Sequence, residues 1–526
     1  MPEPVTLTGA SLGVEDVHAI GAERAPVALD PPALEAVGRN RAALEEAIER
    51  GEAIYGITTG LGALVRERIS LEDAAAMQRD VLRSHAAGVG DPLPREVVRA
   101  ALAVRLNGLL RARSGIRPLV LERVALLLNL ELVAPVPSTG SLGASGDLAP
   151  SAHAFLPLIG EGELSGSNGV PRPAGDVLAE HGLEPLELGP KEALALVNGT
   201  HFMAAIGALL ARRVERLLDS ADAAAALSLD ALHGAPAAFD PRVHELRPLP
   251  GQALSAASVR ALVAGSERLG MREYDNVQDA YSLRCVPQVH GAAREAAGFF
   301  RRLVEVDLNA VTDNPIVFDS GEVVSAGNFH GQSLALAFDV LRIALPDLAS
   351  ISERRTFRLL SPSLNHGLPA FLTPEAGRAS GYMVAQYTAA ALLAELRALA
   401  HPVSLDNVPT SDNQEDHVSM GMTAALLALR ACARAETVVA IETLCAAQGL
   451  ETGTRRPGHG VARLHALVRE QVPPLEEDRP PAPDIESVRE LVASGSLAAV
   501  VQEFTVADPA REIVQAGHFD RTGGPQ

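Results

Sequence analysis

Tryptophan is absent from this chain of 526 residues, and aromatic residues make up only 3% of it. Cysteine is also scarce, with three thiols at Cys285, Cys432 and Cys445 and no CxxC pair. These spacings predict neither a disulfide framework nor a zinc site, and they favour a reducing, cytoplasmic setting. The N-terminus lacks the basic and then apolar pattern of a secretory signal, so none is expected.

Acidic residues outnumber basic ones by 65 to 45, which gives a formal net charge of −20. Nucleic-acid binding through a basic surface is therefore not expected, since phosphate contacts require clustered Lys and Arg. Lysine occurs once, at Lys191 in Gly189-Pro190-Lys191. A pyridoxal phosphate Schiff base would have to form there. A proline just before a helical pattern is typical of a helix start, so we expect a solvated lysine at that helix end and no pyridoxal phosphate.

Long uncharged runs are rare, and the one that needs testing as a membrane span is 193–211. Asn198, Gly199, Thr200 and His201 stand at its centre. Polar groups are costly in lipid, so a buried segment of a large helical protein is the better interpretation.

What the chain has in abundance is helical periodicity. Ala, Leu, Arg and Glu are frequent, which favours helix over strand. Apolar spacing of three and four residues predicts helices over 97–111, 119–132, 202–225, 290–308, 333–360, 380–400 and 420–448. We therefore predict a mainly α fold, a long-helix bundle with a smaller mixed N-terminal domain. Residues 1–115 are expected to form that domain and 116–526 the bundle with its C-terminal helical region. The first hundred residues are read as short segments and loops, 160–175 as a surface hairpin, and 473–483 as a solvated link.

The sequence Ala144-Ser145-Gly146 offers unusual chemistry. Small residues let the backbone turn tightly, and glycine at the third position has no Cβ to block attack of its nitrogen on the Ala144 carbonyl. Ring closure and loss of water from Ser145 would give a methylideneimidazolone, an electrophile that no ordinary side chain provides. A Gly/Ser surface turn is the alternative for the tripeptide taken alone.

Several polar motifs interrupt the apolar helical sequence, and buried polar groups of this kind tend to line clefts. Each also has a structural explanation, such as a helix cap at Asn198 or a surface pair of Tyr281 and Arg284. The motifs lie at 84–88, 197–200, 277–285, 309–315, 327–331 and 410–421.

Together with Ala144-Ser145-Gly146, these motifs resemble the aromatic amino-acid ammonia-lyase family, and within it the members that act on histidine. The similarity runs from about Tyr55 to about Gly449. It implies that the tripeptide cyclises autocatalytically to the methylideneimidazolone. It also implies a fumarase/aspartase-like helical architecture and a homotetramer whose active sites combine residues of three subunits.

The resemblance assigns roles to individual residues. Tyr55, in Tyr55-Gly56-Ile57-Thr58-Thr59-Gly60, is similar to the base that removes the β-proton. The pKa of a phenol, ~10, must be lowered by its surroundings, or the enzyme will favour alkaline pH. Arg284 corresponds to the fork that holds the substrate carboxylate, which suits a guanidinium.

Four further residues follow from the same resemblance. Asn198 and Tyr281 are expected to partner the ring oxygen of the electrophile and the reacting amine. Phe329 would pack beside the ring, and Gln278 would help orient the site.

Substrate choice is expected to depend on Glu415 and on His85 in the pair Ser84-His85. The phenylalanine and tyrosine lyases typically lack a carboxylate at the position of Glu415. A carboxylate can pair with an imidazole but would stay unsatisfied against a phenyl ring. The implied reaction converts L-histidine into trans-urocanate and ammonia.

Some features depart from the family pattern or leave alternatives open. Thr58, Leu61 and His201 stand where Asn, Phe and Gln are commoner. Thr58 also occurs in related aminomutases, so a 2,3-aminomutase remains an alternative. The fumarase and argininosuccinate lyase group needs a Met-Pro-x-Lys loop that is missing here, and an inactive binding scaffold is disfavoured by the intact motifs. No HExxH or Cys/His ligand spacing is present, so no catalytic metal is expected.

Overall fold

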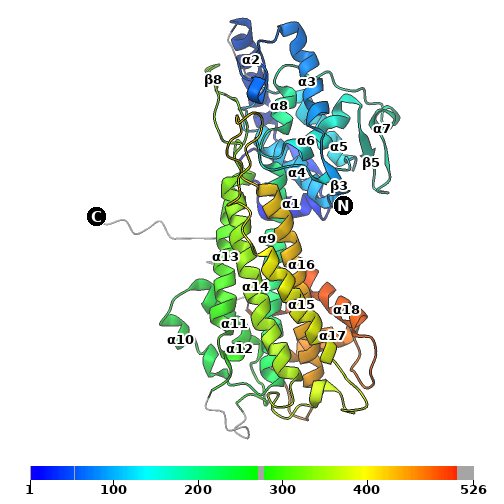
Figure 1. Cartoon of the computed structure of the whole chain (residues 1–526), viewed down its shortest axis with the longest axis vertical. Helices are drawn as coiled ribbons and strands as arrows, with labels where there is room; N and C mark the ends of the chain where they lie inside the picture. The colour runs from blue at the N-terminus through cyan, green and yellow to red at the C-terminus, as the bar shows by residue number, and fades with distance from the viewer. Residues whose placement is uncertain (1, 52–53, 65, 271–277, 506–526) are drawn as a thin grey trace, which may run out of the picture. The chain divides into compact units, whose positions relative to one another are not determined.

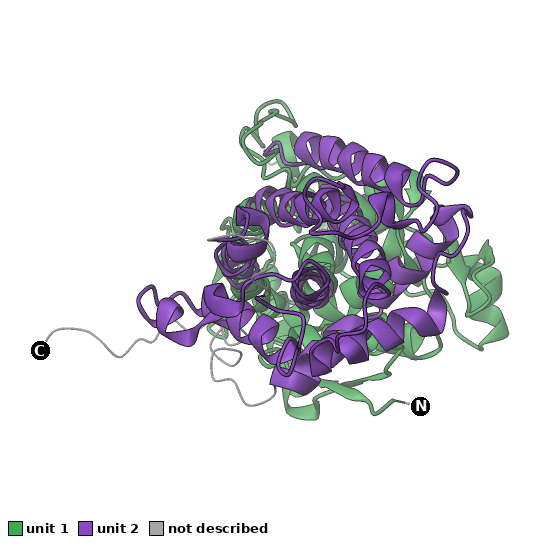
Figure 2. Cartoon of the chain, turned by 90° about the horizontal axis from the view of Figure 1, so that it is seen from below, with its two compact units in different colours: residues 1–212, 301–338, 403–426 green, residues 213–300, 339–402, 427–526 purple. Residues whose placement is uncertain are grey.

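The computed structural model describes residues 2–51, 54–64, 66–270 and 278–505. Its residues form two compact units, each assembled from three stretches of chain (Figure 2). Unit 1 holds residues 1–212, 301–338 and 403–426, and unit 2 holds 213–300, 339–402 and 427–526. The described elements are mainly helices, which confirms the predicted fold class (Figure 1).

Unit 1 combines helices with four two-stranded sheets. The pair β1(Val5–Leu7) and β2(Val27–Leu29) is parallel, and three other pairs are antiparallel. These are β3(Val89–Pro92) with β4(Pro137–Thr139), β5(Glu163–Ser165) with β6(Pro171–Pro173), and β7(Ile316–Val317) with β8(Val323–Val324). The pair β5–β6 confirms the hairpin expected over 160–175. The helices are α1(Val14–Gly21), α2(Pro31–Glu49), α3(Leu71–His85), α4(Arg95–Leu109), α5(Pro118–Asn129), α6(Leu148–Phe155), α7(Ala174–Glu180) and α8(Glu192–Val197).

One small core in unit 1 anchors the segment that carries Tyr55. Helix α2 begins after Asp30, whose carboxylate accepts a hydrogen bond from the Ala33 N–H over 3.1 Å, as an N-cap should. Its inner face packs with the residues on both sides of Tyr55, and the cluster consists of Leu44, Ala47, Ile48, Ile54, Ile57 and Val317. Burial of Ile54 and Ile57 therefore holds the backbone of the tyrosine segment in place.

Four long helices contribute residues to both units: α9(His201–Ala231), α13(Val286–Leu308), α14(Gln332–Leu360) and α16(Gly421–Leu450). Each corresponds to a helix predicted from apolar periodicity. The 193–211 run contains the end of α8 and the start of α9, broken at the polar residues 198–200. In the described part of the chain, no helix has the length and apolar character needed to cross a membrane.

Unit 2 is helical. Besides its share of the long helices it contains α10(Pro241–Glu245), α11(Pro250–Leu262), α12(Tyr281–Arg284), α15(Met383–Leu399), α17(His459–Gln471), α18(Pro481–Ala493) and α19(Ser496–Thr505). Helices α14, α15 and α16 run beside one another (Figure 1). Arg355 of α14 forms a fully buried ion pair with Glu442 of α16, and Gln386 of α15 donates to Glu353 of α14 over 2.6 Å.

Candidate active site

The tripeptide Ala144-Ser145-Gly146 forms a tight turn between β4 and α6. The Gly146 N–H donates to the Gly143 carbonyl over 3.2 Å, and Gly143 and Gly146 pair as an isolated antiparallel bridge. Ser145 adopts a left-handed φ of +50°, which is uncommon for a residue with a side chain. The chain is therefore folded back at the place where ring closure would require it.

The surroundings of this turn accept only glycine at its ends. A Cβ on Gly146 would lie 2.2 Å from the Gly199 carbonyl oxygen, and a Cβ on Gly143 would lie 2.2 Å from the Ser419 hydroxyl oxygen. Gly199 also holds the turn by donating to the Ser145 carbonyl over 3.0 Å and accepting from the Asp147 N–H over 2.8 Å. A bent backbone with no Cβ on the residue that supplies the attacking nitrogen fits the precursor of the methylideneimidazolone.

Asp147 ties the turn to the beginning of α9. Its Oδ2 accepts the backbone N–H groups of Phe202 and Met203 over 2.9 and 3.0 Å, which satisfies two donors at the helix start. Its Oδ1 is buried and has no hydrogen-bond partner in the described residues. Burial raises the pKa of Asp147 to about 7, although the two N–H groups oppose the rise.

Asn198 follows α8 and directly precedes Gly199, the residue that forms hydrogen bonds with the turn. Its Nδ2 donates to Asn314 O over 2.8 Å and to Asp313 Oδ1 over 3.3 Å. The side chain is buried, and Oδ1 has no hydrogen-bond partner among the described residues. The amide therefore keeps one acceptor available.

Tyr55 is half-buried in a short glycine-containing loop. The Gly62 N–H donates to its hydroxyl oxygen over 3.0 Å. Burial raises the pKa of Tyr55 above its usual value, the Gly62 hydrogen bond opposes this rise, and the charge of Glu415 adds to it. The phenol is consequently harder to ionise here than in water.

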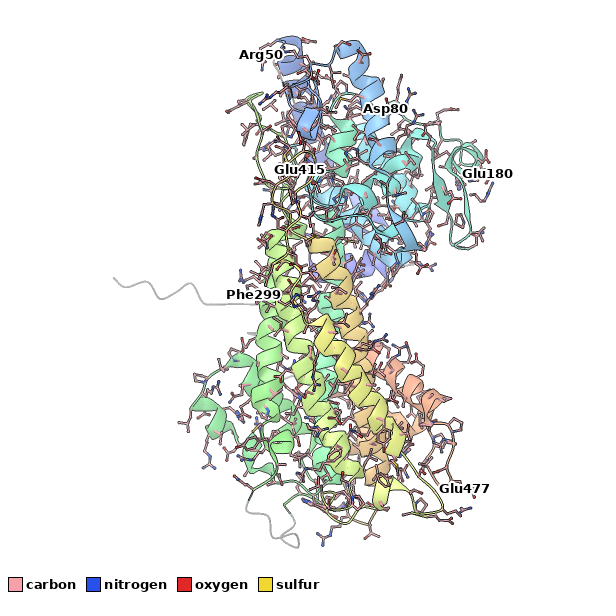
Figure 3. All side chains as sticks on the ribbon, in the orientation of Figure 1. Arg50, Asp80, Glu180, Phe299, Glu415 and Glu477 are labelled. Carbon is pink, nitrogen blue, oxygen red and sulfur yellow. The ribbon has the colours of Figure 1, made fainter. Side chains whose placement is uncertain are left out.

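Glu415 lies on a strained loop of unit 1, labelled in Figure 3. Ser411, Asp412 and Asn413 all have left-handed φ values, between +51° and +63°. The loop is closed by hydrogen bonds between Thr410 and Glu415, which pair as an antiparallel bridge. Such strain persists only where the surroundings enforce it.

The same loop contacts the tyrosine segment. The Ser411 hydroxyl accepts the Ala63 N–H over 3.1 Å, and a Cβ on Gly62 would lie 3.3 Å from Glu415 Oε1. The structure thus brings together the loops that carry two of the predicted site residues, Tyr55 and Glu415.

His85 is the last residue of α3. Its Nδ1 lies 2.9 Å from the Val81 carbonyl oxygen, which can only accept, so Nδ1 carries the proton and Nε2 keeps a lone pair. Burial lowers the pKa of His85, so the neutral ring is favoured.

Phe329 is half-buried in the turn before α14. The next residue, His330, stacks on His417 with ring centroids 5.9 Å apart and has Nε2 3.1 Å from the His417 carbonyl oxygen. Its segment therefore adjoins the loop of Glu415.

Three predicted site residues, Gln278, Tyr281 and Arg284, belong to unit 2, whereas the other eight belong to unit 1. The Arg284 guanidinium stacks 4.5 Å above the Tyr281 ring, and its Nε donates to Asp279 O over 2.9 Å. These residues line a cavity of about 660 Å³ together with Asp279, Ala280, Arg358, Pro362, Ser363, Leu364, His366 and Gly367. Tyr281 is 71% exposed, so an aromatic hydroxyl is accessible there.

The sequence interpretation of Lys191 was wrong. Its side chain is 0% exposed and forms an ion pair with Asp313 over 2.8 Å, so it is not a solvated helix end. Asp313 and Asn314 belong to the polar motif 309–315, for which no individual role was predicted, and they hold the Asn198 amide. No local pattern encodes this contact, because the partners lie more than a hundred residues apart.

Known proteins resemble this chain in sequence. A family model described as aromatic amino acid lyase matches residues 12–470. The histidine ammonia-lyase of Gloeobacter violaceus is 49% identical over 501 residues, covering 95% of this chain and 97% of that protein.

Solved structures agree. The crystal structure of histidine ammonia-lyase from Trypanosoma cruzi gives a TM-score of 0.90 at 38% identity and covers 99% of each chain. Tyrosine aminomutase from Streptomyces globisporus gives a TM-score of 0.92 at 36% identity, covering 96% of this chain and 99% of that one. These likenesses confirm the predicted lyase architecture, and the chain belongs to the aromatic amino acid lyase family.

Proposed function

We propose that this chain is an ammonia-lyase that converts L-histidine into trans-urocanate and ammonia. The observation that carries the proposal is the bent turn Ala144-Ser145-Gly146, whose flanking glycines leave room for no Cβ. The histidine ammonia-lyases of Gloeobacter violaceus and Trypanosoma cruzi support the substrate.

The proposed cofactor is the methylideneimidazolone formed from the turn. Attack of the Gly146 nitrogen on the Ala144 carbonyl carbon would close the ring and release the carbonyl oxygen as water, and Ser145 would lose a second water to give the methylidene carbon. The group supplies an electrophile that bonds the substrate amine and makes it a better leaving group. Gly199, through its hydrogen bonds to Ser145 and Asp147, would keep the backbone bent around it.

Tyr55 is proposed as the base that removes the β-proton. The β-proton would pass to the oxygen of ionised Tyr55, and the Gly62 N–H that donates to this oxygen would stabilise the phenolate before the transfer. The remaining increase in pKa from burial favours turnover at alkaline pH.

Arg284 is proposed to bind the substrate carboxylate, with Tyr281 and Gln278 beside it. Among the described residues Arg284 donates only from Nε, to Asp279 O, so its two terminal nitrogens can form the fork. The exposed Tyr281 ring and the cavity beside it suit a small anionic substrate. Between them, Tyr281 and Asn198 are proposed to contact the reacting amine and the ring oxygen, and Phe329 is proposed to pack beside the ring.

His85 and Glu415 are proposed to recognise the imidazole ring. Glu415 offers a carboxylate that can accept its N–H, and His85 offers an unprotonated Nε2 that can do the same. A phenyl substrate would leave these acceptors without a hydrogen bond. The free-energy cost of an unsatisfied acceptor exceeds the net free energy that a hydrogen bond to histidine contributes.

A 2,3-aminomutase is the second candidate, and the likeness to the Streptomyces globisporus tyrosine aminomutase favours it. An aminomutase returns the amine to the β-carbon and so releases no ammonium. The imidazole-facing pair of His85 and Glu415 favours the lyase.

The test is to incubate the purified protein separately with histidine, phenylalanine and tyrosine while recording ultraviolet spectra and free ammonium. Growth of a conjugated acid band with an equal amount of ammonium from histidine alone is expected. Consumption of histidine without ammonium would favour the mutase, and turnover of phenylalanine or tyrosine alone would refute the substrate assignment.

The wider expectations form part of the same proposal. We propose a homotetramer whose active sites are shared. Each site would be completed by residues of different subunits. The free thiols Cys285, Cys432 and Cys445 agree with a cytoplasmic location. No metal or pyridoxal phosphate requirement is proposed, and the division into 1–115 and 116–526 remains a prediction.

A further inference from the structure

Three fully buried ionisable side chains stand beside Asn198 and have no part in the proposed roles. Lys191 Nζ lies 2.8 Å from Asp313 Oδ2, and Arg105 Nη2 lies 3.9 Å from the same oxygen. The side chains are 0%, 1% and 3% exposed for Lys191, Asp313 and Arg105. Removing such charges from water is expensive, and an apolar replacement is often as stable or more so. Stability alone therefore explains this cluster poorly.

Lys191 bears a second cost in its backbone. It precedes α8 with a φ of +77°, in the left-handed region that disfavours residues with a Cβ. A strained, fully buried lysine is retained where its exact placement matters. The contacts of its partner Asp313 indicate which residue this placement serves.

The contacts of Asn198 fix the orientation of its amide. The two groups that receive its Nδ2 protons, Asp313 Oδ1 and Asn314 O, are able only to accept while Asp313 is ionised. The opposite orientation would place an oxygen against two oxygens. Oδ1 is consequently the group left over, and it is buried with no partner in the described residues.

The charge state of Asp313 depends on its cationic neighbours. Burial alone would raise the pKa of Asp313, but the charges of Lys191 and Arg105 outweigh it and hold the pKa below its usual value. An ionised Asp313 cannot donate a proton to Asn198, so the cations keep Asp313 as the second acceptor that holds the amide in one orientation together with Asn314 O.

The network also supports the backbone next to the tripeptide. Arg105 Nη2 donates to the Ala195 carbonyl of α8, and a Cβ on Gly199 would lie 2.5 Å from Thr312 O. On its other side Gly199 donates to Ser145 O. Residues 195–199 are therefore held between the ion cluster and the turn.

We propose that the Lys191–Asp313 ion pair, with Arg105, is a positioning device that locks the Asn198 amide so that it offers an acceptor, and only an acceptor, to the reacting amine of the substrate. This inference rests on the proposed function and narrows it. Of the two partners proposed for Asn198, an acceptor suits the N–H of the amine and does not suit the ring oxygen. Donation to that oxygen is left to other groups.

Two variants test the device. Asp313→Asn keeps the shape but introduces a group that can donate as well as accept, so that only the Asn314 carbonyl still holds the Asn198 amide in one orientation. Lys191→Met keeps an unbranched side chain one atom shorter and removes its charge. Asp222→Asn in unit 2 is the matched control, because Asp222 is also fully buried and paired with Arg294 over 2.6 Å.

Three readouts are needed: kcat and KM with histidine, near-ultraviolet absorbance for the ring, and backbone hydrogen exchange of Gly199 and Asp147. Both test variants should lower kcat by about tenfold or more relative to the control while KM changes little, as misplacement of a reacting partner does. Exchange at Gly199 and Asp147 should accelerate in the test variants and not in the control. If either kcat or exchange in Asp313→Asn equals that of Asp222→Asn, the proposal is overturned.

The ring absorbance separates misplaced chemistry from a missing electrophile. Retained absorbance with reduced kcat supports positioning of the reacting amine, whereas loss of absorbance in proportion to kcat would overturn it in favour of a role in ring formation. Hydrogen exchange does not need turnover. A wild-type protein that fails to act on histidine would therefore count against the proposed function. The comparison of hydrogen exchange between the variants would still test the positioning role of the ion pair.

Discussion

The Gly62 N–H donates to the Tyr55 hydroxyl oxygen over 3.0 Å, within a single short loop. The bond leaves the hydroxyl proton free to point elsewhere and stabilises the oxygen when that proton is lost. It depends on a left-handed residue, since Gly62 has a φ of +55°. Burial and the charge of Glu415 nevertheless keep the Tyr55 pKa above its usual value.

The first prediction concerns pH. If the deprotonated Tyr55 is the base, its active form becomes more abundant as pH rises, so kcat/KM should increase by about tenfold per pH unit well below the Tyr55 pKa. Tyr55→Phe should reduce kcat by about 10²- to 10⁴-fold without loss of the ring absorbance. A rate in wild type that falls steadily from pH 7 to 10 would contradict the assignment.

The second prediction concerns the turn. Ser145→Ala should lose the absorbance beyond the tyrosine band and nearly all turnover, because the electrophilic carbon comes from that serine. The absence of tryptophan makes this band easy to observe. Gly146→Ala should fail for a different reason, since its Cβ would lie 2.2 Å from Gly199 O. Normal absorbance and activity in Ser145→Ala would remove the cofactor proposal.

The third prediction tests substrate recognition. Glu415→Gln should reduce kcat/KM for histidine by about 100-fold, because the neutral amide is a weaker acceptor for the imidazole N–H. The exposed neighbour Asp416 provides the control, and Asp416→Asn should behave as wild type. Equal kinetics in the two variants would leave histidine recognition without its main residue.

The fourth prediction concerns stability. Asp147 binds its proton more tightly in the folded chain, with a pKa of about 7, than in the unfolded chain, where ~3.9 is expected. The folded state therefore holds an extra proton between these values, and the free energy of unfolding should fall as pH rises through that window.

Thermal unfolding at pH 5 and pH 8 measures this dependence. Asp147→Asn should flatten the difference in Tm between the two pH values, while Asp176→Asn, at an exposed position on α7, should keep it. An unchanged slope in Asp147→Asn would show that the buried carboxyl does not titrate in this range.

The sequence predicted those parts of the fold that local periodicity encodes. Helices α9, α13, α14 and α16 have continuous apolar faces, and their predicted ranges differ from the observed ones by a few residues at the ends. Helix α2 was missed, because its buried face includes the polar residues Asn40 and Arg41 and its apolar repeat is weak.

The site shows the same division. The residues of Tyr55, Ser145 and Glu415 could be read from motifs, but their geometry could not. Ser411, Asp412 and Asn413 turn left-handed with no glycine among them, so tertiary contacts rather than local propensity set that loop. Burial of Lys191 likewise depends on Asp313, which no helical or strand pattern connects to it.

The complete burial of Lys191 has a practical consequence. Because it is the only lysine of the chain, the protein displays no lysine ammonium group on its surface. Reagents that acylate exposed amines will find no side chain to modify in the native protein. Their reaction with Lys191 should begin only as the chain unfolds, so a single acylation site reports denaturation directly.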